Sequence, residues 1–211
     1  MYDNDDFYVI FQILYFRGCT EIMSDNNSRI NEIKTKIKRM LNETRFAHTV
    51  AVCETAVTLA ERFGADKEKA YLAALLHDCA RGLDFEQQIA YCHENGIELD
   101  DYMQNDINPV HALIGADMAK RRFGINDKEI LEAIFRHATG CEDMTLLDKI
   151  IFVADGIEAN RDGDDADEAR KAAEKNLNEA LVPVMRIKTY YLKGRSLHPD
   201  SVKMLKKFCS K

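Results

Sequence analysis

Apolar residues recur every three or four positions along most of the chain. Ile30, Ile33 and Ile37 form the first such stripe, and similar stripes run through residues 46–60 and 71–80. This period is typical of amphipathic helices, whereas a strand with one buried face alternates every two residues. We find neither sustained alternation nor a hairpin signature between two apolar runs. The pattern therefore predicts an all-α fold.

Capping signals divide this pattern into about eight helices. Gly64, Gly96 and Gly124 stand where helix C-caps are expected, and Asp66 and Thr145 are candidate N-caps. Further start signals are the pairs Asp84–Gln87, Asn108–Pro109 and Asn126–Glu129, and Pro199 before a short final helix. The predicted helices include one from Asp66 to Ala80, one from Asn126 to about Gly140, and one long segment that Pro183 bends and Gly194 ends.

The first 26 residues differ from the rest. Residues 7–16 read FYVIFQILYF, a largely apolar run that is too short to span a bilayer. It follows acidic residues and no small-residue cleavage site comes after it, so we do not expect a secretory signal. We expect residues 1–26 to be an N-terminal extension, and residues 1–22 are absent from the native product if translation starts at Met23. Residues 27–211 are expected to form a single helical domain.

The composition limits the partners of this domain. A net charge of −7 argues against a general nucleic-acid or membrane-surface binder. The six cysteines form no CxxC pair, and several lie in apolar helical runs, as reduced thiols of a cytoplasmic protein do. We therefore expect a cytoplasmic protein that binds neither nucleic acid nor membrane. An anionic small molecule fits this charge only if its site is locally positive.

Polar side chains interrupt the apolar stripes at six positions. These are His48, His77, Asp78, His111, His137 and Asp155. A histidine in a core is usually a structural residue, and a carboxylate buried alone is strongly unfavourable. As a set, the six residues are typical of a site for divalent metal ions. Their ligand atoms are nitrogen and oxygen without a thiolate, which suits iron or manganese, with zinc as an alternative.

In this order the six residues resemble the H…HD…H…H…D pattern of the HD superfamily of metal-dependent phosphohydrolases. The resemblance implies a single HD-domain helical bundle with two metal ions, and it favours iron. It also implies the ligands: one ion is held by His48, His77, Asp78 and Asp155, and Asp78 bridges to a second ion held by His111 and His137.

Longer segments are similar to one branch of this superfamily, the YqeK-type symmetrical diadenosine tetraphosphate hydrolases. They are RFAHTVAV, AALLHDCAR, NPVHALIGA, residues 135–161 and KGRSLHPDSV. The similarity runs from about Ile30 to the C-terminus. It implies that a metal-activated hydroxide attacks a phosphorus clamped by the two metals and releases two ADP, and it is compatible with a homodimer. Ala138, Gly156 and Ala159 depart from this branch, which affects the nucleotide pocket and not the metal ligands.

Positive side chains near the six residues are candidates for neutralising a polyphosphate. Arg81 follows Asp78 by three residues and Lys149 precedes Asp155 by six. We expect Asp78, Arg81 and Lys149 to take part in catalysis. The residues expected to contact substrate are Arg45, Thr139, Gly140 and Arg161. A surface salt bridge is the alternative role for each cation. His93 and His198 lie outside the pattern and are expected to be structural or exposed.

Two other functions stay open at this point. One is a different nucleotide phosphohydrolase of the HD type, such as a nucleotidase or an alarmone hydrolase, which would share the metal ligands and differ in its nucleotide pocket. The other is a non-catalytic HD module that senses nucleotides. The complete ligand set argues against this second alternative, because a sensor would be free to lose ligands.

Overall fold

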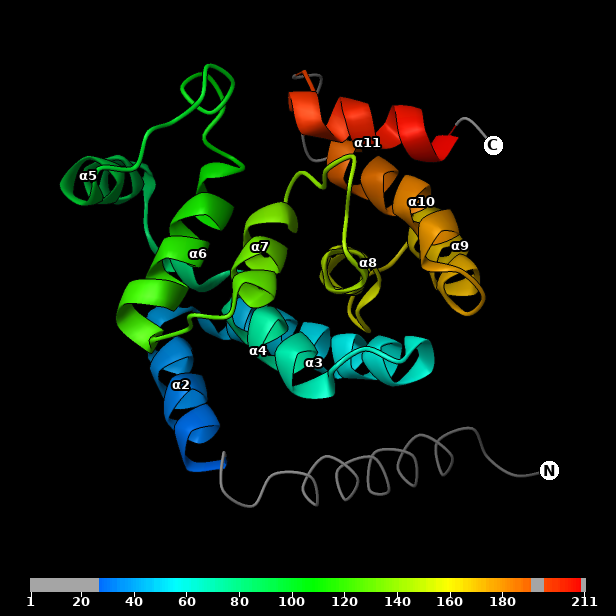
Figure 1. Ribbon diagram of the computed structural model, residues 1–211, viewed down its shortest axis with the longest axis horizontal. Coiled ribbons are helices and arrows are strands. Elements are labelled where there is room, and N and C mark those ends of the chain that lie inside the picture. The colour runs from blue at the N-terminus through cyan, green and yellow to red at the C-terminus, as the bar shows by residue number, and fades with distance from the viewer. Residues whose placement is uncertain (1–26, 191–195, 210–211) are drawn as a thin grey trace. The chain divides into compact units, whose positions relative to one another are not determined.

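The computed structural model describes residues 27–190 and 196–209 (Figure 1). The predicted N-terminal extension, residues 1–26, and the predicted helix end at Gly194 lie outside the described residues. The chain divides into two units, residues 1–36 and 37–211. Helix α2 (Asn27–Met40) crosses this boundary. In the first unit, Ile30 and Ile33 are buried and one helical turn apart, as the spacing predicts.

The described part of the second unit contains helices and no strands, which confirms the all-α prediction. Its elements are α3 (Glu43–Phe63), α4 (Lys67–Leu76), the 3₁₀ turn η1 (Cys79–Gly82), α5 (Phe85–Asn95), α6 (Val110–Phe123), α7 (Lys128–Arg136), α8 (Leu146–Ile157), α9 (Asp164–Ala173), α10 (Leu177–Tyr190) and α11 (Pro199–Cys209). None of the described helices combines the length and the apolar character that crossing a membrane requires.

Most predicted helix ends agree with the structure. Gly64, Gly96 and Gly124 cap the C-termini of α3, α5 and α6, and the side chain of Asp66 accepts two backbone N–H groups at the start of α4. Reciprocal capping boxes begin α5 and α8, at Asp84–Gln87 and Thr145–Asp148. Local capping chemistry is readable from sequence because donor and acceptor lie within four residues of each other.

Three helix starts differ from the prediction. Asn108 does not cap α6, since its side chain donates to Asp106 and the helix begins after Pro109. The N-cap of α7 is Asp127 and not Asn126, because the Asp127 carboxylate accepts the first free N–H groups. The long segment after the acidic turn is two helices, α9 and α10. Asn176 separates them, because its side-chain oxygen accepts the N–H of Asn178 and starts a new helix.

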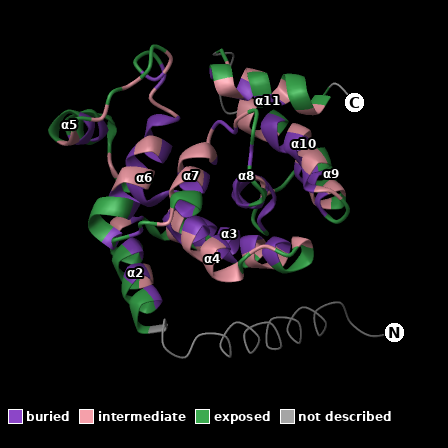
Figure 2. Ribbon diagram, in the orientation of Figure 1, coloured by how far each residue is buried: buried purple, intermediate pink, exposed green. Residues whose placement is uncertain are grey.

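Helix α8 lies at the centre of the second unit. It contacts α3, α4, α7, α9 and α10, and Figure 1 shows it nearly end-on among α3, α7 and α10. Ile150, Ile151 and Phe152 are fully buried, and Figure 2 colours this helix almost entirely as buried. Removal of this apolar surface from water is the main force that holds the surrounding helices to α8. Asp155 is carried into the interior on the same helix.

Candidate metal centre

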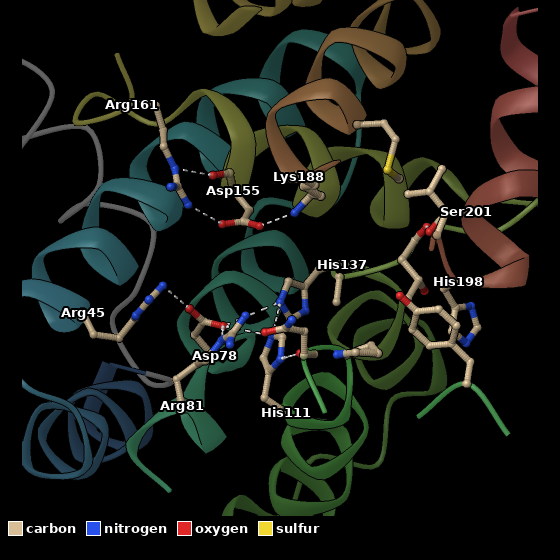
Figure 3. Close-up of a pocket in the computed structure, with 17 residues that line it drawn as sticks. Arg45, Asp78, Arg81, His111, His137, Asp155, Arg161, Lys188, His198 and Ser201 are labelled. Carbon is tan, nitrogen blue, oxygen red and sulfur yellow. Dashed lines mark hydrogen bonds and ion pairs between the residues drawn. The ribbon is translucent and has the colours of Figure 1, made fainter. Parts of the chain in front are cut away.

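The six predicted ligands come from four helices and the segment after α4, and they meet in one buried cluster. Figure 3 shows four of them, Asp78, His111, His137 and Asp155. His48 lies on α3, His77 and Asp78 follow α4, and Asp155 lies in the last turn of α8. His111 and His137 belong to the first turn of α6 and the end of α7. All six are buried. The cluster therefore gathers residues that are up to 107 positions apart in the sequence.

The ligand atoms form two groups that share one residue. Group A consists of His48, His77 and Asp78, and group B of Asp78, His111 and His137. Within each group, one ligand atom per residue lies within 4.8 Å of the others. Oδ2 of Asp78 faces group A, 3.6 Å from His77 Nε2, and Oδ1 faces group B, 3.4 Å from His111 Nε2. Asp155 adjoins group A, with Oδ1 3.1 Å from His48 Nε2.

Helix ends orient three of the four imidazole rings. The sequence predicted longer helices around His77 and His137, but α4 and α7 end so that these two residues are the C-caps. Their Nδ1 atoms lie 2.6 Å from the carbonyl oxygens of Ala74 and Ile134, since the last carbonyls of a helix have no partner within it. His111 Nδ1 contacts the carbonyl of Asn108 in the same way. A carbonyl only accepts, so each Nδ1 carries the proton and each Nε2 presents its lone pair to the cluster.

This arrangement fits metal ions. Nε2 of His48 and Nε2 of His77 are buried and have no hydrogen-bond partner within the described part of the chain. The Nε2 atoms of His111 and His137 lie 3.1 Å apart, so two lone pairs face each other. Lone pairs and carboxylates held together in a low-dielectric interior repel unless cations lie among them. Imidazole and carboxylate are suitable ligands for divalent iron, manganese or zinc.

Burial and neighbouring charges keep the two carboxylates charged and His77 neutral. Burial would raise the pKa of Asp78, but its histidine neighbours and Arg81 hold that pKa well below its ordinary value. Burial acts likewise on Asp155, where Lys188 and His48 keep the pKa well below the ordinary value. Burial lowers the pKa of His77 to about 4. At neutral pH the site therefore presents anionic carboxylates and a neutral His77, which are the forms that bind metals.

Three of the predicted cations line the pocket beside the cluster. Arg45 lies 2.9 Å from Asp78 Oδ2, Arg81 lies 3.5 Å from Asp78 Oδ1, and Arg161 lies 3.3 Å from Asp155 Oδ1. Their side chains are about one quarter to two fifths exposed, so a bound anion could reach them. These three arginines make the pocket locally positive although the chain as a whole has a net charge of −7, as an anionic ligand requires.

The fourth predicted cation, Lys149, is not at the site. Its Nζ lies 5.5 Å from the ring of Phe208, and it does not line the pocket. Six residues turn an α-helix by about 600°, so the side chains of Lys149 and Asp155 point about 120° apart. The structure brings Lys188 to the site instead. Its Nζ pairs with Asp155 Oδ2 and its side chain is 17% exposed in the pocket wall. In the sequence Lys188 is one lysine of an amphipathic helix, and no signal marks it.

Thr139 and Gly140, both predicted to contact substrate, lie differently. Thr139 lines the pocket, whereas Gly140 does not. Gly140 has φ of +66°, and a Cβ there would lie 2.5 Å from the Sδ of Met204. The glycine is therefore required by backbone conformation and by packing against α11.

The pocket continues from the cluster to an end formed by the C-terminal segment. Its volume is about 320 Å³. His198, expected to be structural or exposed, is buried and lines this end together with Tyr102, and the two rings meet edge to face with centroids 5.1 Å apart. His198 Nε2 lies 3.0 Å from Asp100, and the Ser201 hydroxyl donates to the carbonyl of Thr139. Figure 3 shows His198 and Ser201 on the side away from Arg45 and Arg161.

An all-α domain that buries histidines and aspartates from several helices in one cluster, open to a pocket lined with arginines, has the features of a metal-dependent hydrolase. The model of the HD domain matches residues 45–160, more than half of the chain. The chain therefore belongs to the HD domain family, as the order of the six residues predicts.

Individual relatives are similar over most of their length. The symmetrical bis(5'-nucleosyl)-tetraphosphatase of Bacillus subtilis (strain 168) is 42% identical over 171 residues, which cover 78% of this chain and 89% of that protein. The protein of the same name from Staphylococcus aureus (strain NCTC 8325 / PS 47) is 37% identical, covering 68% and 74%. A crystal structure from Clostridium acetobutylicum, described as a predicted HD superfamily hydrolase involved in NAD metabolism, is 39% identical. It superposes with a TM-score of 0.80 over 86% of this chain and 97% of that chain.

Proposed function

We propose that this chain hydrolyses diadenosine tetraphosphate symmetrically, giving two ADP, with two divalent metal ions. The observation that carries the proposal is the pair of ligand groups sharing Asp78 at the bottom of a pocket lined by cations. The names of the relatives from Bacillus subtilis and Staphylococcus aureus support this choice of substrate over a mononucleotide or an alarmone.

Group A with Asp155 would hold one ion and group B the other, and Asp78 would contact both. Divalent ions bound there would supply hydroxide at neutral pH, by lowering the pKa of water, and would neutralise phosphate charge. We propose iron as the native metal because the family resemblance favours it; the nitrogen and oxygen ligands suit manganese equally, and zinc is a further alternative. The protein's part is to keep the carboxylates ionised and to direct the Nε2 lone pairs of the histidines inward.

Positive side chains would orient the polyphosphate. Arg45, Arg81, Arg161 and Lys188 each pair with Asp78 or Asp155 and also line the pocket. Guanidinium groups bind phosphate oxygens with two parallel hydrogen bonds, which fixes the orientation of the group. The leaving group is a diphosphate that gains negative charge as the bond breaks. Cations already in place stabilise that charge without reorganisation.

The other end of the pocket suits a nucleoside. Tyr102 and His198 offer aromatic surface, and Met185 and Leu197 offer apolar surface. Ligand sites commonly combine such walls with a few polar groups. A volume of about 320 Å³ is small for the whole dinucleotide, so we place one nucleoside with its two phosphates in the pocket and the other half outside. A symmetric cut requires that two phosphates separate this nucleoside from the attacked bond.

The test is product analysis with the metal-loaded chain. ADP as the sole product of diadenosine tetraphosphate supports the proposal, whereas ATP and AMP contradict the symmetric cut. Release of phosphate from mononucleotides or alarmones, with diadenosine tetraphosphate left intact, identifies a different HD-type phosphohydrolase. A chain that binds metal and nucleotide without turnover is a sensor module.

We propose further that residues 27–211 form the HD domain and that the protein is a cytoplasmic homodimer. No disulfide joins the five cysteines that the structure describes, in keeping with a reducing compartment. A variant that starts at Asn27 should retain turnover if residues 27–211 form the whole HD domain.

Light scattering tests the homodimer and should give twice the mass of one chain. A monomer at micromolar concentration contradicts the dimer.

A further inference from the structure

His48 differs from the other three histidines in the group that its second ring nitrogen contacts. Nδ1 of His77, His111 and His137 bonds to the main-chain carbonyl three residues earlier. Nδ1 of His48 lies 3.1 Å from Oε1 of Glu158, in the buried part of the structure. One histidine of the cluster therefore donates to a charged acceptor and three donate to neutral ones.

The local structure explains this difference. His48 lies inside α3, where backbone carbonyls already accept helical hydrogen bonds, so its Nδ1 must find a partner on another element. Glu158 is the C-cap of α8 and follows Asp155 by three residues, about one helical turn. The two carboxylates thus face the two nitrogens of one ring. Oδ1 of Asp155 lies 3.1 Å from Nε2, and Oε1 of Glu158 lies 3.1 Å from Nδ1.

Glu158 is held firmly in this position. The residue is 2% exposed, and its Oε2 accepts the N–H of Asn160 at 2.7 Å. Arg161 Nε lies 3.6 Å from its Oε1, and the N–H of Arg161 donates to its main-chain carbonyl at 2.9 Å. A buried carboxylate is unfavourable unless it is paired. Glu158 therefore pairs most closely with His48 of the cluster, at 3.1 Å, and at longer range with Arg161 of the pocket wall.

We infer that Glu158 is a positioning residue of the metal centre, which holds the Nδ1 proton of His48 and so makes group A the tighter of the two metal groups. A carboxylate behind a metal-binding histidine fixes its tautomer and strengthens it as a ligand, more than a carbonyl does. Asp155 adds a second carboxylate to this side alone. The first equivalent of metal therefore binds at His48, His77, Asp78 and Asp155, and the second binds more weakly at group B.

This inference rests on the metal-dependent function proposed above, and titration of the metal-free full chain with Co²⁺ tests it separately from activity. Calorimetry and the visible absorption of Co²⁺ should show two classes of site in the wild type. Glu158→Gln removes the charge and keeps the size of the side chain. We expect it to weaken the tighter class by about 10- to 100-fold, to change the visible spectrum of the first equivalent, and to leave the weaker class unchanged.

Asp148→Asn is the matched control. Asp148 is also a fully buried carboxylate of α8, but it pairs with Arg136 at 2.7 Å, outside the cluster. The Asp148→Asn variant should leave both affinities for Co²⁺ within about threefold of the wild type. Only a carboxylate that bonds to a metal-binding side chain strengthens that side chain as a ligand. Circular dichroism of each metal-free variant checks folding. If Glu158→Gln does not fold, Glu158→Asp keeps the charge but falls one methylene short of Nδ1, and the same selective weakening is expected.

Unchanged Co²⁺ binding in the Glu158 variants overturns the inference, and so does equal weakening of both classes or an equal effect of Asp148→Asn. A wild-type chain with a single class of site, or with none, also overturns it. The two proposals can fail separately. If the wild type binds two Co²⁺ with different affinities and Glu158→Gln weakens only the tighter class, the role of Glu158 stands even if diadenosine tetraphosphate is left intact, which refutes the proposed function.

Discussion

Replacement of Asp78 by asparagine should remove both metal ions, whereas the same change at Asp155 should remove one. The two oxygens of Asp78 lie 3.4–3.9 Å from the Nε2 atoms of all four histidines, but Asp155 approaches only His48 and His77. Loss of one partner from a buried charge interaction costs about 3–5 kcal/mol. Since about 1.4 kcal/mol is a factor of ten, each affected site should bind metal roughly 10²- to 10⁴-fold more weakly.

The assay is the metal content of each variant after dialysis against a fixed free concentration of Mn²⁺, with circular dichroism as the check on folding. We expect two ions per chain in the wild type, about one in Asp155→Asn and fewer than one in Asp78→Asn. Turnover should be lost in both variants. Retention of two ions by Asp78→Asn, or identical metal content in the two variants, would refute the reasoning that Asp78 is shared.

Three further outcomes are expected. Lys188→Met should lower kcat/KM for diadenosine tetraphosphate by about 10- to 100-fold, the loss of one charge-assisted contact, while Lys149→Met should stay within about threefold; steady-state kinetics checks both. Gly140→Ala should lower the unfolding free energy by about 1–3 kcal/mol in urea denaturation, since φ is positive and Met204 occupies the space; an unchanged midpoint contradicts this. Chelation of the metal should lower the Tm, and added Mn²⁺ should restore it, because the ions bind only the folded chain; equal Tm values would show that no metal is bound.

The all-α fold and the gathering of six residues could be predicted because each signal is local. An apolar stripe reports one face of a helix, and a histidine or aspartate within that stripe must point inward with it. The stripes at His48, His111 and Asp155 show this directly. The exact ends of α4 and α7 could not be predicted. His77 and His137 look like continuations of their helices, but both use a free carbonyl of the last turn.

The surroundings of the cluster were harder to predict because they depend on tertiary packing. Lys149 and Lys188 are indistinguishable as lysines on amphipathic segments, and only the packing of α10 on α8 brings Lys188 to Asp155. Glu158 did have a signal that sequence reasoning missed. Its spacing of three from Asp155 places two carboxylates one turn apart at the end of an apolar helix. His198 lines the other end of the pocket beside Asp100 and Tyr102, which lie 98 and 96 residues away in the sequence.

The central claim is that buried imidazoles and carboxylates are tolerated here because together they hold two cations. Anomalous diffraction from crystals of the full chain grown with Mn²⁺ measures this directly. We expect two anomalous peaks per chain, about 3.5–4 Å apart, on either side of the Asp78 carboxylate. A map without peaks at Asp78, or with a single peak that His111 and His137 do not contact, would contradict the account.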